Sequence, residues 1–179
     1  MILANAVMDL HTLMRRFEQL PYAQAARGPK HPDEPDRSFA KEVSALPRVY
    51  PHIRKDPGYF AFLECYSGAG IYPPDFDHRP YNFMTIYGLG EYDDPDSPAL
   101  DSQGYHCFCT SFFNHPERRE DIHYSFALDA TGKRPNGVYR SIGTKTNWQW
   151  YCGSFLEWLA IVVERKGRLL VFDSKGLPM

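Results

Sequence analysis

Three residues close together in the sequence, His106, Cys107 and Cys109, could bind a metal ion. Alternate residues of a β-strand point to the same face, so Cys107 and Cys109 would share one face and could meet one zinc ion. No second Cys-x-x-Cys or His-x-x-x-His pair supplies the remaining ligands, and the nearest candidates are His115 and His123. We therefore favour two reduced, buried cysteines that act as small hydrophobic residues. A small metal-dependent enzyme is the least favoured alternative.

No other pattern in the sequence indicates catalysis or a cofactor. The Gly-x-Ser-x-Gly elbow of serine hydrolases is absent. Glycine pairs at residues 68–70 and 88–90 complete neither a dinucleotide fingerprint nor a phosphate-binding loop. Carboxylates and a histidine at residues 75–78 lie among prolines, which favours a rigid turn. We predict no catalytic residue, no metal ligand and no cofactor.

The segment from Glu91 to Asp101 is acidic and contains no lysine or arginine, and Pro95 and Pro98 keep it out of regular structure. Two interpretations stay open: a solvated loop, or a docking surface that steers a basic partner. Nearby tyrosines strengthen the second, because tyrosine is common among the residues that dominate binding energy. The candidate partner-binding residues are Tyr87, Glu91, Tyr92, Asp93, Asp94, Asp96 and Asp101.

Length and composition limit the class of protein. The 179 residues fit one domain spanning 1–179, and 43% apolar and 15% aromatic residues suffice for a sizeable core. A net charge of −2 gives no basic excess for general nucleic-acid binding. The N-terminus lacks the apolar run of a secretory signal, and no stretch is long enough to span a bilayer. We therefore expect a cytoplasmic protein with reduced thiols and no membrane partner.

Helical signals dominate the first part of the chain. Apolar residues recur at steps of three and four over residues 1–20, which predicts an amphipathic helix. Residues 21–37 are rich in proline and polar residues and read as a loop or mobile linker. A short helix is expected from Ser38 to Leu46-Pro47. Another begins at Asp56-Pro57, an N-cap followed by proline, and stops near Gly68.

Strand-like patterns follow, and a final helix closes the predicted fold. Ser154 and Glu157 have capping-box spacing at the start of an apolar helix. Trp148 and Trp150 would share a strand face, and we favour a buried pair packed on this helix. The less favoured alternative is an exposed aromatic platform for a base or a sugar, because no positive charge flanks the pair. This order indicates an α+β fold with N-terminal helices, a central, mostly antiparallel sheet of four to six strands and a C-terminal helix packed on the sheet. The expected strands are 83–87, 105–113, 122–128, 138–142, 148–151 as a possible extension of the sheet, and an edge strand at 168–173.

Three motifs in this order resemble the SUKH superfamily, over roughly residues 40–165. They are Leu46-Pro47, the aromatic helix from Tyr59 to Ile71, and the segment Ser154-Phe155-x-x-Trp158-Leu159. The chain departs from the family pattern because Arg48–Gly58 separates the Leu-Pro motif from the aromatic helix. The first helix and residues 21–37 are also additions.

The SUKH superfamily includes yeast cell-wall-assembly regulators and bacterial immunity proteins of polymorphic toxin systems. The resemblance implies a non-catalytic protein that neutralises a cognate toxin by binding it. A toxin with a basic cleft, such as a nuclease, would suit the acidic segment. The alternative is a regulatory scaffold of the same fold that recruits a partner through residues 1–37.

Overall fold

The computed structural model describes residues 2–73, 81–88, 100–114, 122–143 and 146–169, and within them it confirms the α+β class. The helices are α1 (Ile2–Phe17), α2 (Ala40–Val49), α3 (Pro57–Cys65) and α4 (Phe155–Glu164), with short 3-10 turns η1 (Arg37–Phe39) and η2 (Pro51–Lys55). The strands are β1 (Ala23–Arg27), β2 (Tyr66–Ile71), β3 (Tyr81–Ile86), β4 (Tyr105–Asn114), β5 (Ile122–Asp129), β6 (Val138–Ile142) and β7 (Gln149–Cys152).

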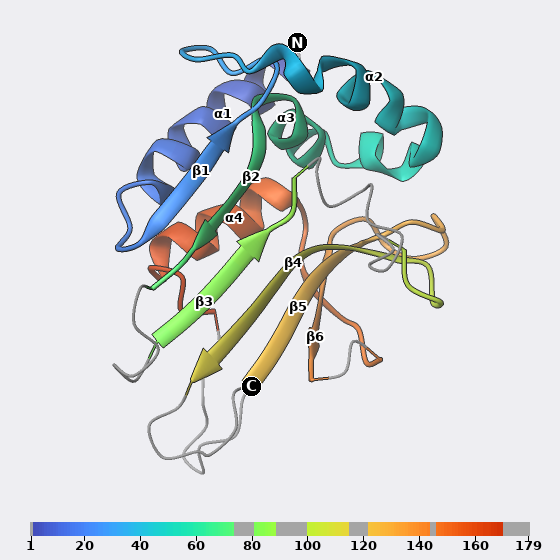
Figure 1. Cartoon of the computed structure of the whole chain (residues 1–179). Coiled ribbons are helices and arrows are strands. Elements are labelled where there is room, and N and C mark those ends of the chain that lie inside the picture. The colour runs from blue at the N-terminus through green and yellow to red at the C-terminus, as the bar shows by residue number, and fades with distance from the viewer. Residues whose placement is uncertain (1, 74–80, 89–99, 115–121, 144–145, 170–179) are drawn as a thin grey trace.

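The seven strands form one antiparallel sheet in which the spatial order follows the sequence order, from β1 to β7. Helices α1, α3 and α4 lie together behind this sheet, and α2 lies at its upper end (Figure 1). Among the described residues the opposite face carries no helix. The face of the sheet toward α1, α3 and α4 is therefore the one packed on the core.

Aromatic side chains from the helices and the sheet build the core. Tyr59 of α3 packs on Phe108 of β4, with ring centroids 5.3 Å apart. Trp158 of α4 lies 5.0 Å from Phe108 and 5.4 Å from Phe126 of β5. Buried aromatic rings contribute large apolar areas, so these contacts join α3, α4 and the centre of the sheet.

Helix α1 belongs to the same core. Leu10, Met14 and Phe17 have no exposed surface, and they lie at the helical spacing that the sequence pattern predicts. The first segment of the chain is therefore an integral part of the fold.

Two strands were missed by the sequence analysis, which is why the sheet has seven strands and not four to six. Residues 21–37 are not a simple linker, because β1 lies within them and pairs with β2. Helix α3 ends at Cys65, and the chain enters β2 at once, so Gly68 lies in a strand and is not a helix stop. At Gly70 an added Cβ would lie 2.5 Å from the carbonyl oxygen of Met84, so only glycine fits this close strand contact.

Other boundaries differ less. Helix α2 continues through Pro47 to Val49, and α4 begins as predicted, with the Ser154 hydroxyl accepting a hydrogen bond from the backbone N–H of Glu157. Arg168 and Leu169 are not in a strand, and the rest of the predicted edge strand lies outside the described residues. None of the described helices is long and apolar enough to cross a membrane.

Candidate protein-binding surface

Side chains of β4, β5, β6 and β7 meet on the helix-free face of the sheet. The register places Cys107 opposite Ala127, Ala127 opposite Tyr139, and Tyr139 opposite Trp150. Directly opposed residues of neighbouring strands point to the same side. Ala127 follows Phe126, which contacts Trp158 on the core side, so this row of side chains faces away from the helices.

Tyr105 is the centre of a stack on this face. The Trp148 ring lies against the Tyr105 ring with centroids 5.0 Å apart and an angle of 29°. The Arg134 guanidinium lies 4.1 Å from the centroid of the Tyr105 ring, which is cation–π distance. Tyr139 meets Tyr105 edge-on at 5.2 Å. Tyr105 and Tyr139 are buried, and the more exposed Trp148 and Arg134 pack on the Tyr105 ring.

Hydrogen bonds to two aspartates hold the outer members of the stack. Arg134 donates from Nη1 to Asp129 Oδ1 at 2.8 Å and from Nη2 to the carbonyl oxygen of Gln103 at 3.0 Å. Trp148 donates from Nε1 to Asp101 Oδ2 at 2.8 Å. Burial alone would raise the pKa of Asp129, but hydrogen bonds from Thr131 and Arg134 outweigh it and lower this pKa to about 2. The Asp129 carboxyl is therefore ionised at neutral pH.

Trp150 completes the surface, and 56% of its area is exposed. The predicted buried pair of Trp148 and Trp150 is therefore wrong. Both residues lie on the face away from α4, and Trp158 of α4 itself fills the space between the helix and the sheet. We call the group of Tyr105, Arg134, Tyr139, Trp148 and Trp150 the aromatic surface.

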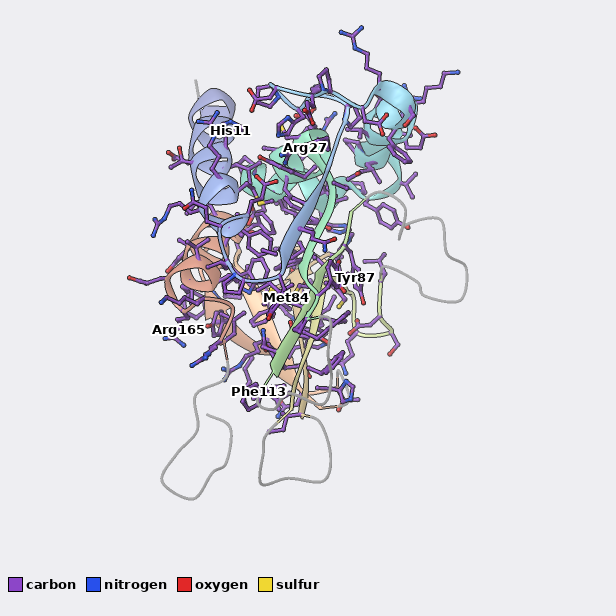
Figure 2. The ribbon with its side chains drawn as sticks, turned by 60° about the vertical axis from the view of Figure 1, so that its left-hand side comes forward. His11, Arg27, Met84, Tyr87, Phe113 and Arg165 are labelled. Atoms are coloured by element: carbon purple, nitrogen blue, oxygen red, sulfur yellow. The ribbon has the colours of Figure 1, made fainter. Side chains whose placement is uncertain are left out.

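Of the seven residues that the sequence nominates for partner binding, Tyr87 and Asp101 are described. Glu91, Tyr92, Asp93, Asp94 and Asp96 lie outside the described residues. Tyr87 lies on the side of the sheet away from α1 and α4, as Figure 2 shows, and its hydroxyl lies 2.7 Å from the Thr110 hydroxyl. Asp101 Oδ1 accepts hydrogen bonds from the backbone N–H groups of Gln103 and Tyr105. Asp101 thus joins the acidic segment to the aromatic surface.

The residues of the metal hypothesis do not come together. A β-bulge at Phe108 breaks the alternation of β4, so that Cys107 pairs with Ala127 and Cys109 with Phe126. The prediction that Cys107 and Cys109 share a face is therefore wrong, because Ala127 and Phe126 point to opposite sides. Within the described part of the chain, no three histidine, cysteine or acidic side chains are placed to hold a metal ion.

His106 instead pairs with a histidine that the sequence did not single out. His52 Nε2 lies 2.7 Å from His106 Nδ1, and both residues are buried. Two nitrogen ligands of one tetrahedral zinc ion would lie about 3.3 Å apart, so this distance fits a hydrogen bond between neutral rings. Burial lowers the pKa of His106 to about 3 and that of His52 to about 4, with Lys55 adding to the effect on His52.

Nothing in the sequence marks Tyr105, Arg134 and Tyr139 as members of a surface. The available signal was the run Asp129-Ala130-Thr131-Gly132, which is typical of a turn, because Asp129 closes this turn by accepting from Thr131 and from the backbone N–H of Arg134. The stack on Tyr105 is formed by residues that are far apart in the sequence, so the local spacing of residues does not predict it.

The comparisons with known proteins add no relative to this description. No protein-family model matches the chain, and no curated protein or solved structure matches it either.

Proposed function

We propose that this chain is a non-catalytic immunity protein that binds a cognate toxin domain in the cytoplasm and so neutralises it. The observation that carries the proposal is the aromatic surface, in which the exposed Trp150 lies opposite Tyr139, and Tyr139, Trp148 and Arg134 pack around Tyr105. The SUKH resemblance of the sequence supplies the class of partner.

The chemistry of the aromatic surface suits protein binding. Tryptophan, tyrosine and arginine dominate the energetic centres of protein interfaces. The Trp148 indole and the Arg134 guanidinium are each held by an aspartate and by the Tyr105 ring, so little side-chain entropy would be lost when a partner docks.

The negative charge of the acidic segment favours a partner with basic groups. Asp101 accepts a hydrogen bond from Trp148, so the described end of the segment contacts the aromatic surface directly. A partner with basic groups around an apolar patch, such as the active-site cleft of a nuclease, would be complementary to the two together.

Reduced thiols are consistent with the proposed compartment. Cys65, Cys107, Cys109 and Cys152, all among the described residues, form no disulfide bond. Burial raises the pKa of Cys65 to about 11 and that of Cys152 to about 12, so these thiols are unreactive at neutral pH.

The alternative scaffold function has less support. It assigns recruitment to residues 1–37, but Leu10, Met14 and Phe17 are committed to the core and β1 is paired with β2. Deletion of residues 1–37 would therefore unfold the protein and would not isolate a recruitment arm.

Calorimetric titration tests the proposed function. The full chain is titrated with the C-terminal domain of the toxin encoded beside its gene, at low and at high salt. We expect a dissociation constant on the order of nanomolar and a measurable loss of affinity at high salt. Absence of binding to the folded toxin domain would overturn the proposal.

A further inference from the structure

A pocket of about 270 Å³ opens where three connections meet at one end of the sheet. It lies between the end of η2, the β5–β6 turn and the β7–α4 junction. Its walls include Lys55, Asp56, Asp129, Asn136, Gly137 and Ser154. The volume lies just below the range of pockets for drug-sized ligands, which is about 300–1,000 Å³, so it suits a small molecule or one side chain.

The two carboxylates in the wall are already committed to donors of the fold. Asp56 Oδ1 accepts from the backbone N–H of Tyr59, and Asp56 Oδ2 accepts from that of Phe155. Asp129 accepts from Thr131 and Arg134 through both oxygens. A cationic ligand would therefore have to share both carboxylates with these donors.

Hydrogen-bond donors, in contrast, remain available. Within the described residues, the Lys55 ammonium has no acidic partner and the Asn136 side-chain amide has no hydrogen bond. The Ser154 hydroxyl accepts from the Glu157 N–H, and its own proton is donated to no described residue. A ligand in the pocket would therefore meet an ammonium, an amide and a hydroxyl that can all donate.

Lys55 is the only lysine or arginine among the residues that line the pocket. Of the acidic groups around it, Asp129 is paired with Arg134, and Asp56 accepts from the backbone N–H groups of Tyr59 and Phe155. Glu157 accepts from the backbone N–H of the lining residue Gly153. The Lys55 ammonium is therefore the group of the wall that would attract an anion.

We propose that this pocket binds a singly charged carboxylate, with Lys55, Asn136 and Ser154 as the donors. A phosphate dianion fits less well, because its second charge would face the carboxylates of Asp56 and Asp129. The carboxylate can come from a small molecule or from an acidic side chain of a partner. The pocket adjoins the aromatic surface, because Nε1 of Trp150 would lie 2.7 Å from a Cβ added at the lining residue Gly137. A partner that docks on the aromatic surface could therefore reach the pocket with an acidic side chain.

Nuclear magnetic resonance titration of the ¹⁵N-labelled full chain tests the site without any partner. The probes are sodium acetate, inorganic phosphate at pH 7.5 and sodium chloride, at constant ionic strength. We expect saturable shifts of the Lys55, Gly137 and Ser154 amides with acetate, at a dissociation constant on the order of millimolar. Absence of saturation, equal shifts with chloride, or tighter binding of phosphate would each overturn the proposal.

Two variants test whether the acetate-induced shifts arise from binding in the pocket. Lys55→Met removes the ammonium from the pocket wall, and we expect it to weaken acetate binding about tenfold or more. Lys133→Met is the matched control, an exposed lysine of the neighbouring turn that does not line the pocket, and we expect a change below about twofold. Equal effects of the two variants would show diffuse attraction to surface charge and would overturn the proposal.

A second experiment distinguishes a small molecule from an acidic side chain of the toxin as the source of the carboxylate. Only this experiment rests on the proposed function. Acetate is titrated into the complex of the chain with the toxin domain. Loss of the acetate shifts, together with weaker toxin binding by Lys55→Met than by Lys133→Met, assigns the pocket to an acidic side chain of the toxin. Unchanged acetate binding in the complex assigns it to a small carboxylic acid. Failure of toxin binding leaves the acetate result intact, so the two proposals fail separately.

Discussion

Asp56 and Phe155, 99 positions apart in the sequence, are joined by a hydrogen bond of 2.7 Å from the backbone N–H of Phe155 to Asp56 Oδ2. The other carboxylate oxygen, Oδ1, accepts from the N–H of Tyr59 at 3.0 Å. A single buried carboxylate therefore caps α3 and α4 together. It fixes the two helix N-termini beside each other, and with them one wall of the pocket.

Removal of this double cap should be costly. Loss of one N-cap costs about 1 kcal/mol, and buried donors left without an acceptor cost about 1–3 kcal/mol more. We therefore expect Asp56→Ala to lower the free energy of unfolding by about 3 kcal/mol in urea denaturation. Asp56→Asn retains one acceptor oxygen and should lose about half as much. A loss below about 1 kcal/mol for Asp56→Ala would show that Asp56 does not stabilise the N-termini of α3 and α4.

The buried pair of His52 and His106 predicts a loss of stability in mild acid. Their pKa values in the folded chain, about 4 and about 3, lie below the ordinary value of 6.5. As the pH falls below 6.5, the unfolded chain binds protons that the folded chain does not, so the stability present above pH 6.5 is lost. His106 alone should lower the free energy of unfolding by roughly 1 kcal/mol per pH unit between pH 6 and pH 4.5.

Urea denaturation at several pH values measures this slope. His106→Asn should reduce the slope, whatever its effect on stability at pH 7. The control is His123→Asn, at an exposed residue of β5, which should leave the slope unchanged. A stability that is flat over this pH range would contradict neutral, buried histidines.

Tyr22 occupies a turn position that favours glycine. Its φ of 63° lies in the left-handed region, and the N–H of Ala23 donates to the carbonyl oxygen of Leu20 across the turn. The Tyr22 side chain is 56% exposed, so few contacts offset the strain. We expect Tyr22→Gly to raise the free energy of unfolding by about 0.5–1 kcal/mol. Tyr22→Ala keeps the strain and should not stabilise the chain, and equal effects of the two variants would contradict this account.

Local signals in the sequence were sufficient for the helices and for five strands. The Asp56-Pro57 start and the Ser154–Glu157 cap are short-range patterns, and both are present in the structure. Strands β1 and β2 were missed because alanine and glycine dominate them, and these residues have low strand propensity. Tertiary pairing at the edge of the sheet overrides this propensity.

The functional features were harder to predict than the fold. The bulge at Phe108 reverses the faces of Cys107 and Cys109, and nothing in the sequence marks it. Whether Trp148 and Trp150 are buried depends on which face of the sheet the helices cover. The alternation of side chains along a strand does not determine that face. The pairing of His52 with His106 joins residues 54 positions apart.

On the proposed function, the acidic segment should contribute mainly to the rate of association with the toxin. We expect simultaneous substitution of Asp93, Asp94 and Asp96 by Asn to lower the association rate constant about tenfold at low salt and to flatten its salt dependence. Surface plasmon resonance at several salt concentrations measures both effects. The matched control is substitution of Asp33 and Glu34 by Asn and Gln, because these exposed acidic residues lie far from the segment in the sequence. An unchanged rate and salt slope for the triple variant would exclude the acidic segment from the contact.

On the proposed function, Trp150 should carry a large share of the affinity for the toxin and little of the stability of the fold. Its exposed indole lies on the edge strand β7 opposite Tyr139 of the aromatic surface, and tryptophan is enriched among the anchor residues of interfaces. We expect Trp150→Ala to weaken toxin binding by about 2 kcal/mol or more, roughly thirtyfold, in calorimetric titration. Because the residue is 56% exposed, the free energy of unfolding should change by less than about 1 kcal/mol. Val49→Ala, at a 64% exposed residue of α2, is the matched control and should leave affinity unchanged. Equal affinities of the two variants would remove the aromatic surface from the toxin contact, even if the chain itself still binds.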